Sequence, residues 1–372
     1  MFILSSFFCS IITRLRGDLI MALGDGIRRN IADVSPDERR RLRDAFIQFN
    51  KKRYGGSPND TQFGQPVPGG VTFWFKQDEI HARTGVHNQP IFLPWHRELC
   101  NRLEQGLREI DPELSLHYWD WTTDPRKQVR NGVTFSLFTS DFMGNDNGDA
   151  GEPWQSGGFY DPDANPVRSN DPHGLDFNAA FVPQNLIRIV GQIGAPNDSA
   201  RQAELTLAAT YRDALNIIED LHNQAHSYIG GFGGTIGNPH ISFRDPFVFL
   251  LHSNVDRLFA FWQLQPGHSE RLNPAEVYGN EANTVTQYVG GITRRDGYDF
   301  VDDPETITWG LSSPMLPWSG YEFDAMDSNG VQRRLAIIPI RPWGKPENEH
   351  VGHVRSAMDP SVVLPPKYDT NP

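Results

Sequence analysis

The sequence contains twelve histidines, and half of them could bind metal ions as two separate groups. These groups are His81, His87 and His96, which lie within sixteen residues, and His222, His226 and His252, which begin 126 residues after His96. A neutral imidazole is a good ligand for copper, zinc, iron and nickel. Neither group has a cysteine or carboxylate at a ligand spacing. Two groups of the same composition therefore predict a pair of like metal ions.

The second group has a spacing that is typical of a helical metal site. His222 and His226 are four residues apart in a predicted helix, 203–227, so both imidazoles project from one face. His252 lies in the next predicted helix, 246–263, which is apolar nearly all round and should be buried. The two helices together could supply three ligands to one metal ion.

The first group should be delivered by two further helices. Residues 71–80 are expected to begin a helix that positions His81, and leucines at helical spacing predict a helix over 95–110 that carries His96. Four helices that direct ligands inward form a helix-bundle metal site. We therefore predict a mainly α fold: a four-helix bundle core that holds a dinuclear metal site, with long loops and a few short strands.

Outside the histidine groups, the clearest element is a helix that begins after Ser35. Ser35 is a typical N-cap, Pro36 suits the first helical position, and Glu38 would complete a capping box. Residues 122–200 are rich in Gly, Pro, Asn and Asp and indicate long loops, and 334–340 indicates a strand. The glycine-rich run 230–237 lacks the GK[ST] of a phosphate-binding loop.

Length and composition limit the remaining possibilities. The 372 residues favour one large domain, and the net charge of −12 argues against binding to nucleic acid. Two cysteines provide no disulfide framework. Residues 1–25 are expected to be a disordered or spurious extension. Their apolar stretch lacks the preceding positive charge of a signal peptide and is too short for a membrane span, so the localisation stays open.

Two patterns resemble the copper-binding signatures of the tyrosinase family, which includes tyrosinases, catechol oxidases and polyphenol oxidases. One is H-x4-F-L-x-W-H-R over 87–97 with Glu104 after it, and the other is DP-x3-L-x-H-x3-D over 245–256. The resemblance covers about residues 26–330, which we expect to be a tyrosinase-like dicopper domain of the bacterial type. Residues 331–372 are expected to be a tail that packs on this domain.

The resemblance assigns a role to each histidine group. The first group corresponds to the ligands of one copper ion, CuA, and the second to the ligands of the other, CuB. The expected cofactors are thus two copper ions, with O2 as co-substrate. The family oxidises o-diphenols to o-quinones, and we extend this expectation to o-aminophenols and, weakly, to monophenols. The expected partners are therefore O2 and a small phenol, without nucleic acid or membrane.

Hydroxylating relatives use an asparagine after the first CuB histidine and a nearby glutamate, which together hold a water that removes the phenol proton. Asn223 matches that asparagine. Glu219, three residues before His222, is the first candidate for the carboxylate, and Asp213 is the alternative. Asn223 and Glu219 are therefore the predicted catalytic residues.

The chain also departs from the family pattern. Many relatives have a cysteine, linked to a histidine, at the position of Gly85, so this crosslink should be absent. Leu251 replaces a histidine, and Val248 replaces the first phenylalanine of the CuB signature. Cys100 is expected to be a buried, unreactive thiol.

Two other functions use similar residues. A haemocyanin-like protein that binds O2 reversibly would use the same six histidines, but it would cover the copper pocket with a further domain. A dinuclear zinc hydrolase would need bridging carboxylates, which neither group contains. We therefore expect a dicopper oxidase.

Overall fold

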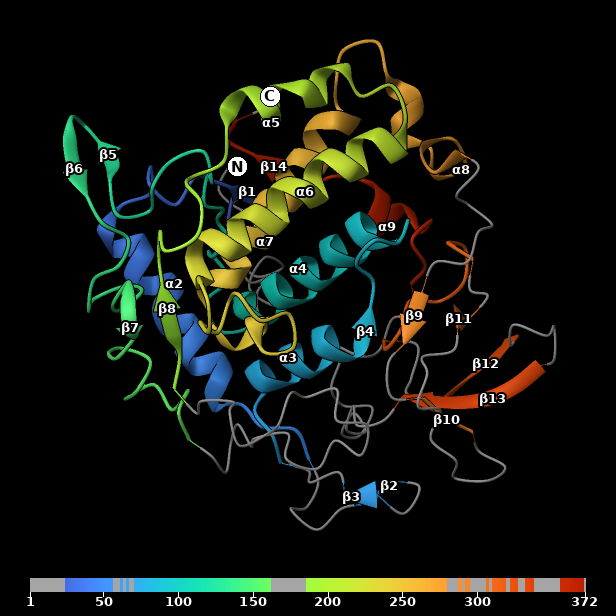
Figure 1. Cartoon of the computed structure of the whole chain (residues 1–372), viewed down its shortest axis with the longest axis horizontal. Coiled ribbons are helices and arrows are strands. Elements are labelled where there is room, and N and C mark those ends of the chain that lie inside the picture. Colours follow the sequence, from blue (N-terminus) through green and yellow to red (C-terminus); the bar gives the residue numbers. More distant parts are fainter. Residues whose placement is uncertain are drawn as a thin grey trace, which may run out of the picture.

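A computed structural model of the chain is mainly helical, as Figure 1 shows. The residues that it describes are 24–55, 61–62, 65–66, 70–161, 185–279, 287–289, 292–294, 306–307, 310–318, 322–326, 332–337 and 355–370. Most of the expected N-terminal extension lies outside these residues. Within them, no helix is long and apolar enough to cross a lipid bilayer.

The helices differ widely in length, and the five longest build the core. The α-helices are α2 (Pro36–Lys51), α3 (Phe73–Arg83), α4 (Phe92–Arg108), α5 (Ser199–Ala203), α6 (Tyr211–Gly230), α7 (Phe247–Gln263), α8 (Pro274–Val277) and α9 (Pro360–Val363). Three short 3-10 helices are η2 (Glu204–Leu207), η3 (Ser242–Arg244) and η4 (Ser269–Leu272).

The strands are short and peripheral. They are β1 (Ile27–Arg28), β2 (Thr61–Gln62), β3 (Gln65–Pro66), β4 (Thr84–Gly85), β5 (Gln128–Arg130), β6 (Val133–Phe135), β7 (Asn147–Asp149), β8 (Ile187–Ile189), β9 (Gln287–Val289), β10 (Ile292–Arg294), β11 (Thr306–Ile307), β12 (Glu322–Met326), β13 (Gln332–Ile337) and β14 (Lys367–Tyr368). The largest sheets have three strands, in the orders β10-β13-β12 and β11-β9-β4.

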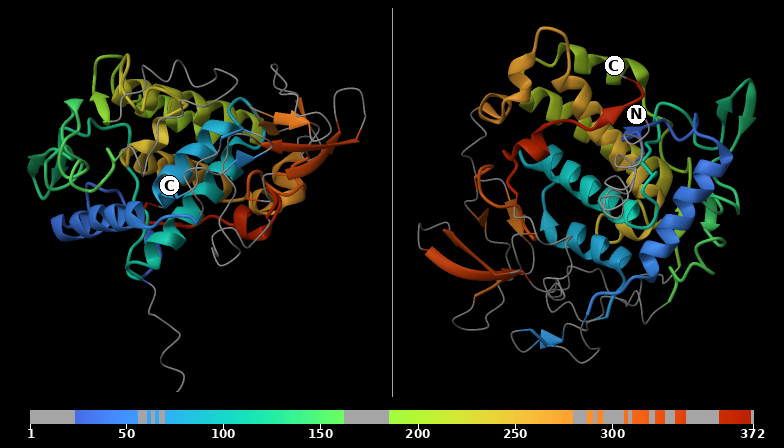
Figure 2. Two further views of the ribbon diagram at one scale, coloured as in Figure 1. Left: turned by 90° about the horizontal axis from the view of Figure 1, so that it is seen from below. Right: turned by 180° about the vertical axis from the view of Figure 1, so that it is seen from behind.

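The centre of the molecule is a bundle of α3, α4, α6 and α7, which lie side by side in Figures 1 and 2. α7 packs against both α4 and α6, and α3 packs against η3. Nearly every side chain of α7 is buried because helices and loops surround it on all sides. The predicted four-helix bundle is thus confirmed.

Two helices differ from the predictions at their N-terminal ends, one in its capping contacts and one in its first residue. Ser35 caps α2 by accepting the backbone N–H of Glu38, but the Glu38 carboxylate accepts from Nε2 of the buried His117 and does not complete the capping box. The helix predicted over 203–227 was wrong at its start. A full capping box between Thr210 and Asp213 begins a new helix there, and the preceding residues form α5 and η2.

The two ends of the described chain meet beside the bundle, where β1 pairs with β14 in parallel (Figure 2). Arg28 on β1 donates to Asp256 on α7, at 2.8 Å, and Tyr368 on β14 donates to the same carboxylate, also at 2.8 Å. Arg97 on α4 forms a second ion pair with Asp256. These three donors tie α7 to β1, β14 and α4 through the buried Asp256 carboxylate.

Candidate metal centre

The six predicted histidines come together inside the bundle as two triads. The first triad is His81 on α3, His87 in the segment 86–91 and His96 on α4, and the second triad is His222 and His226 on α6 with His252 on α7. Within each triad, one ligand atom from each ring lies within 4.8 Å of those of the other two. Helices therefore carry five of the six rings, and a non-helical segment carries His87.

Hydrogen bonds orient five of the six rings. The Nδ1 atoms of four lie 2.7–3.1 Å from backbone carbonyl oxygens, those of Pro239, Phe92, Ile236 and Val248 for His81, His96, His226 and His252 respectively. The Nδ1 atom of His222 lies 3.0 Å from Oδ1 of Asn223. A carbonyl oxygen can only accept, so Nδ1 carries the proton in each ring. Each Nε2 is then an unprotonated lone pair.

These lone pairs are buried without hydrogen-bond partners, which tests whether metal ions fit. The Nε2 atoms of His81, His96 and His226 have no partner within the described residues. The Nε2 atoms of His222 and His252 lie only 3.1 Å apart, although neither has a proton to share. Two lone pairs at this distance repel each other unless a cation lies between them. The donor set therefore fits a metal ion in each triad.

Burial keeps the imidazoles neutral. It lowers the pKa of His87 and of His226 to about 4, and repulsion between neighbouring imidazolium charges would add to this in His87. Burial likewise holds the pKa of the other four far below the ordinary value for histidine. Neutral rings can coordinate a metal at neutral pH without first losing a proton.

The two triads face each other closely. The rings of His96 and His252 stack at 4.7 Å between centroids with 21° between their planes, and those of His87 and His222 lie 5.5 Å apart at 26°. The two triads would therefore hold two metal ions, and such a pair of ions could act together on one small ligand.

Two buried phenylalanines each contact both triads. The Phe92 ring lies 4.5 Å from His96 and 5.1 Å from His222. The Phe243 ring lies 4.2 Å from His81 and 4.6 Å from His252. The sequence did not single out Phe243, because it lies in η3 and in neither signature.

A cavity of about 330 Å³ opens onto both triads. It is lined by His81, His87, His222, Asn223, His226, Ser227, Ile236, Gly237 and Pro239. Four of the six histidines thus form its floor and wall. Among the lining residues, Asn223, Gly237 and Pro239 are exposed, so the cavity reaches solvent in the part of the chain that the structure describes.

The glycine-rich run 230–237 shapes one wall of this cavity. A Cβ atom on Gly230 would lie 2.0 Å from the backbone nitrogen of Gly237, so only glycine permits this close turn. The turn brings the carbonyl of Ile236 within 2.7 Å of Nδ1 of His226. The glycines therefore orient a metal-binding ring. Their density in the sequence was the signal that could have indicated this role.

A sequence model of a protein family, the common central domain of tyrosinase, matches residues 59–265, which is more than half of the chain. The chain belongs to the tyrosinase family.

The chain is similar to several individual proteins. The chain is 28% identical over 285 residues to grixazone synthase from Streptomyces griseus, covering 64% of this chain and 84% of that protein. It is 28% identical over 314 residues to the tyrosinase of Streptomyces lincolnensis, covering 80% of this chain and 98% of that one. A functional unit of octopus haemocyanin is 19% identical, with a TM-score of 0.48 over 93% of this chain and 68% of that one.

Membership of the tyrosinase family makes the chain a copper oxidase at the level of the family. The two histidine triads suggest a dicopper site, in agreement with the coordination chemistry of imidazole. Cys100 is a free, fully buried thiol on α4 whose pKa is raised by burial. It is therefore unreactive, as predicted.

The structure distinguishes the residues predicted to handle a proton in this tyrosinase-family site. Asn223 lines the cavity. Glu219 is 7% exposed and lies outside the cavity lining, and its Oε1 accepts the backbone N–H of Asn88 at 2.6 Å. Burial raises the pKa of Glu219 to about 7. Asp213, the alternative, is used in the capping box of α6 and lies at the exposed helix start.

Proposed function

We propose that the chain is a dicopper oxidase that uses O2 to oxidise o-diphenols to o-quinones, accepts o-aminophenols and hydroxylates monophenols slowly. The cavity over both triads carries this proposal. Its volume of about 330 Å³ lies at the lower end of the range for small-molecule sites, which suits a single aromatic ring. Two histidines of each triad line the cavity, so a ring bound there would lie beside both triads.

Each triad would hold one copper ion through its three imidazoles, with Nε2 as the ligand atom in the five rings whose Nδ1 is hydrogen-bonded. Bound copper would supply the redox chemistry: two o-diphenol molecules each lose two electrons and two protons, and one O2 becomes two waters. The protein itself keeps the imidazoles neutral, fixes the planes of five of them through the Nδ1 hydrogen bonds and offers the substrate a cavity beside both triads.

A monophenol must also lose its proton before it can react. We propose that Asn223 and Glu219 assist this step. The Oδ1 atom of Asn223 is held by Nδ1 of His222, which leaves the amide N–H groups free to hold a water at the cavity wall. Glu219 lies one turn earlier on α6, and a pKa of about 7 allows its carboxylate to accept a proton near neutral pH. Because Glu219 is not among the residues that line the cavity, this transfer is indirect, so monophenol hydroxylation should be slow.

The test compares matched substrates on copper-loaded protein. Initial rates of O2 consumption should be high with catechol, lower with o-aminophenol and lowest with the matching monophenol. A monophenol rate equal to the catechol rate would contradict the indirect proton path. Reversible O2 uptake without turnover of any phenol would instead indicate a haemocyanin-like carrier. Bound zinc without copper, together with hydrolytic activity, would indicate the hydrolase.

A further inference from the structure

His87 is supported differently from the other five histidines. It lies in the segment 86–91, which connects β4 to the start of α4 and contains neither helix nor strand. Neither of its ring nitrogens has a hydrogen bond to a described residue, whereas the other five rings are each oriented through Nδ1. The position of His87 therefore depends on what holds the backbone of this segment.

Two side chains of α6 hold that backbone. Oε1 of Glu219 accepts the N–H of Asn88 at 2.6 Å, and the Tyr211 hydroxyl donates to the carbonyl of Pro90. Asn88 has a φ of 59°, a left-handed conformation that asparagine tolerates better than most residues and that needs support from its surroundings. Both contacts are to backbone groups that follow His87 in the chain, so they hold the backbone and do not involve the His87 ring.

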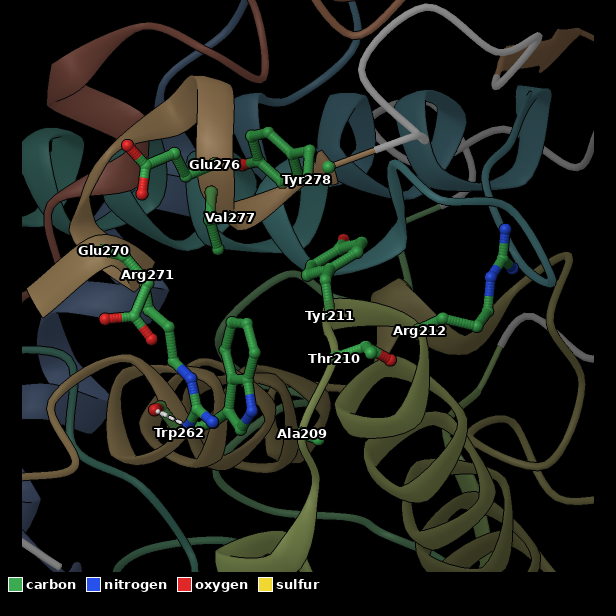
Figure 3. Close-up of a pocket in the computed structure, with 11 residues that line it drawn as sticks. Ala209, Thr210, Tyr211, Arg212, Trp262, Glu270, Arg271, Glu276, Val277 and Tyr278 are labelled. Atoms are coloured by element: carbon green, nitrogen blue, oxygen red, sulfur yellow. Dashed lines mark hydrogen bonds between the residues drawn. The ribbon is translucent and has the colours of Figure 1, made fainter. Parts of the chain in front are cut away.

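The Tyr211 side chain is itself firmly placed. Its ring packs edge-on against Tyr278 at 5.0 Å and lies 6.2 Å from Trp262. Figure 3 shows these aromatic rings in the wall of a second cavity, of about 440 Å³, at the N-terminal end of α6. The Tyr278 hydroxyl donates to the carbonyl of Ala357 at 2.7 Å, which fixes the position of the Tyr278 ring. Tyr211 therefore provides a rigid donor to the segment.

The geometry of α6 links these contacts to the second triad. Glu219 and His222 are three residues apart and lie on the same face of the helix, and Tyr211 lies two turns before Glu219 on that face. The ring of His222 also stacks on His87 at 5.5 Å. One helix face thus carries two ligands of the second triad and both contacts to the segment of the first.

We propose that Glu219 and Tyr211 are positioning residues that tether the segment 86–91 to α6 and hold His87 in place for the metal ion of the first triad. This inference rests on the proposed dicopper function. Without the tether, the segment must lose its conformational freedom when the metal binds, which weakens binding at that triad. The second triad does not include the segment, so its metal ion should be retained.

The tether acts through a hydrogen-bond acceptor at position 219, so its chemistry can be separated from the proposed proton transfer. A glutamine retains an oxygen that can accept the N–H of Asn88, but it cannot act as a base. A leucine of similar size removes both properties. At position 211, phenylalanine retains the buried ring and removes only the hydroxyl. The exposed neighbour Asp220 offers matched control variants on the same helix.

The experiment follows copper loss from the full chain. Wild type and the variants Glu219→Leu, Glu219→Gln, Tyr211→Phe, Asp220→Leu and Asp220→Asn are loaded with copper and exposed to a chelator, and copper per chain is measured over time. We expect Glu219→Leu to lose one of its two copper ions at least tenfold faster than wild type and to retain the other. Tyr211→Phe should show a smaller increase for the same ion. Glu219→Gln and both Asp220 variants should stay within about threefold of wild type.

A second measurement identifies which ion is lost. His87→Ala removes the ligand itself and should leave one slowly released copper ion, and adding Glu219→Leu to His87→Ala should not accelerate its release further. Wild-type kinetics in Glu219→Leu, or equal acceleration of both ions, would overturn the tether, even if the melting temperature of the metal-free protein falls. A wild-type chain that binds fewer than two copper ions would instead overturn the proposed function.

Discussion

The first and second triads contain the same three donor groups but depend on the rest of the chain in different ways. The second triad comes from two consecutive helices, α6 and α7, and the spacing of His222 and His226 is enough to place two of its rings together. The first triad comes from α3, α4 and the segment between them, and it depends on contacts with α6 for its shape. The comparison shows that three imidazoles can be brought together either by the local geometry of a helix or by packing between segments that are far apart in the chain.

The two triads are most alike at His96 and His252. Each lies on a central helix, each has its Nδ1 2.9 Å from the carbonyl four residues earlier, and the two rings stack. Changing either residue to alanine should remove one copper ion per chain and abolish diphenol oxidation, because the copper ion of the altered triad would keep only two ligands. Copper analysis and catechol turnover measure this, and His268→Ala, at a partly exposed histidine outside both triads, is the control. A fully active His252→Ala would refute the dinuclear site.

The triads differ in the residue four positions before the stacked histidine. On α4 this residue is Phe92, whose ring contacts the histidines, whereas on α7 it is Val248, and Phe243 from η3 makes the aromatic contact. If Phe243 supports the second triad as Phe92 supports the first, alanine at either position should destabilise the protein by a similar amount, about 3–5 kcal/mol. Urea unfolding of the metal-free protein measures this.

The exposed Phe232, whose side chain is 78% accessible, provides the control for that experiment, since Phe232→Ala should leave stability almost unchanged. A loss of less than about 1 kcal/mol in Phe243→Ala would show that its ring only fills space that other side chains can take.

Acid should affect the triads alike. The folded-state pKa of His87 and of His226 is about 4, below the ordinary value of 6.5, so the folded protein binds fewer protons than the unfolded chain in this range. Stability of the metal-free protein should therefore fall as the pH drops from about 6.5 to 4, by roughly 1–3 kcal/mol for each of these two partly exposed rings. Urea unfolding at several pH values measures the slope.

Phenylalanine variants of these two residues sharpen this test. His87→Phe and His226→Phe should each reduce the dependence on pH by a similar amount, because each removes one group that titrates. A stability that does not change between pH 6.5 and 4 would contradict the buried, neutral state of the rings.

The smallest expected effect concerns Asn223, whose side chain contacts His222 of the second triad. Asn223→Ala should reduce the monophenol rate about tenfold more than the catechol rate, because only the monophenol needs help in losing its proton before it reacts. Ser227→Ala, which also alters the cavity lining, is the control. If both rates fall together in Asn223→Ala, the amide only orients His222 through their 3.0 Å contact.

The sequence alone determined which residues form the two triads and which helices build the bundle. Imidazole spacing, helix periodicity and the two signatures are local properties, readable over a few turns. The tertiary structure decided how the site is supported: Glu219 meets Asn88 across 131 residues, and Pro239 meets His81 across 158. It also decided that the Phe243 ring contacts both triads and that Asp213 caps a helix. These contacts depend on how distant helices pack, and helical periodicity carries no information about partners so far apart in the chain.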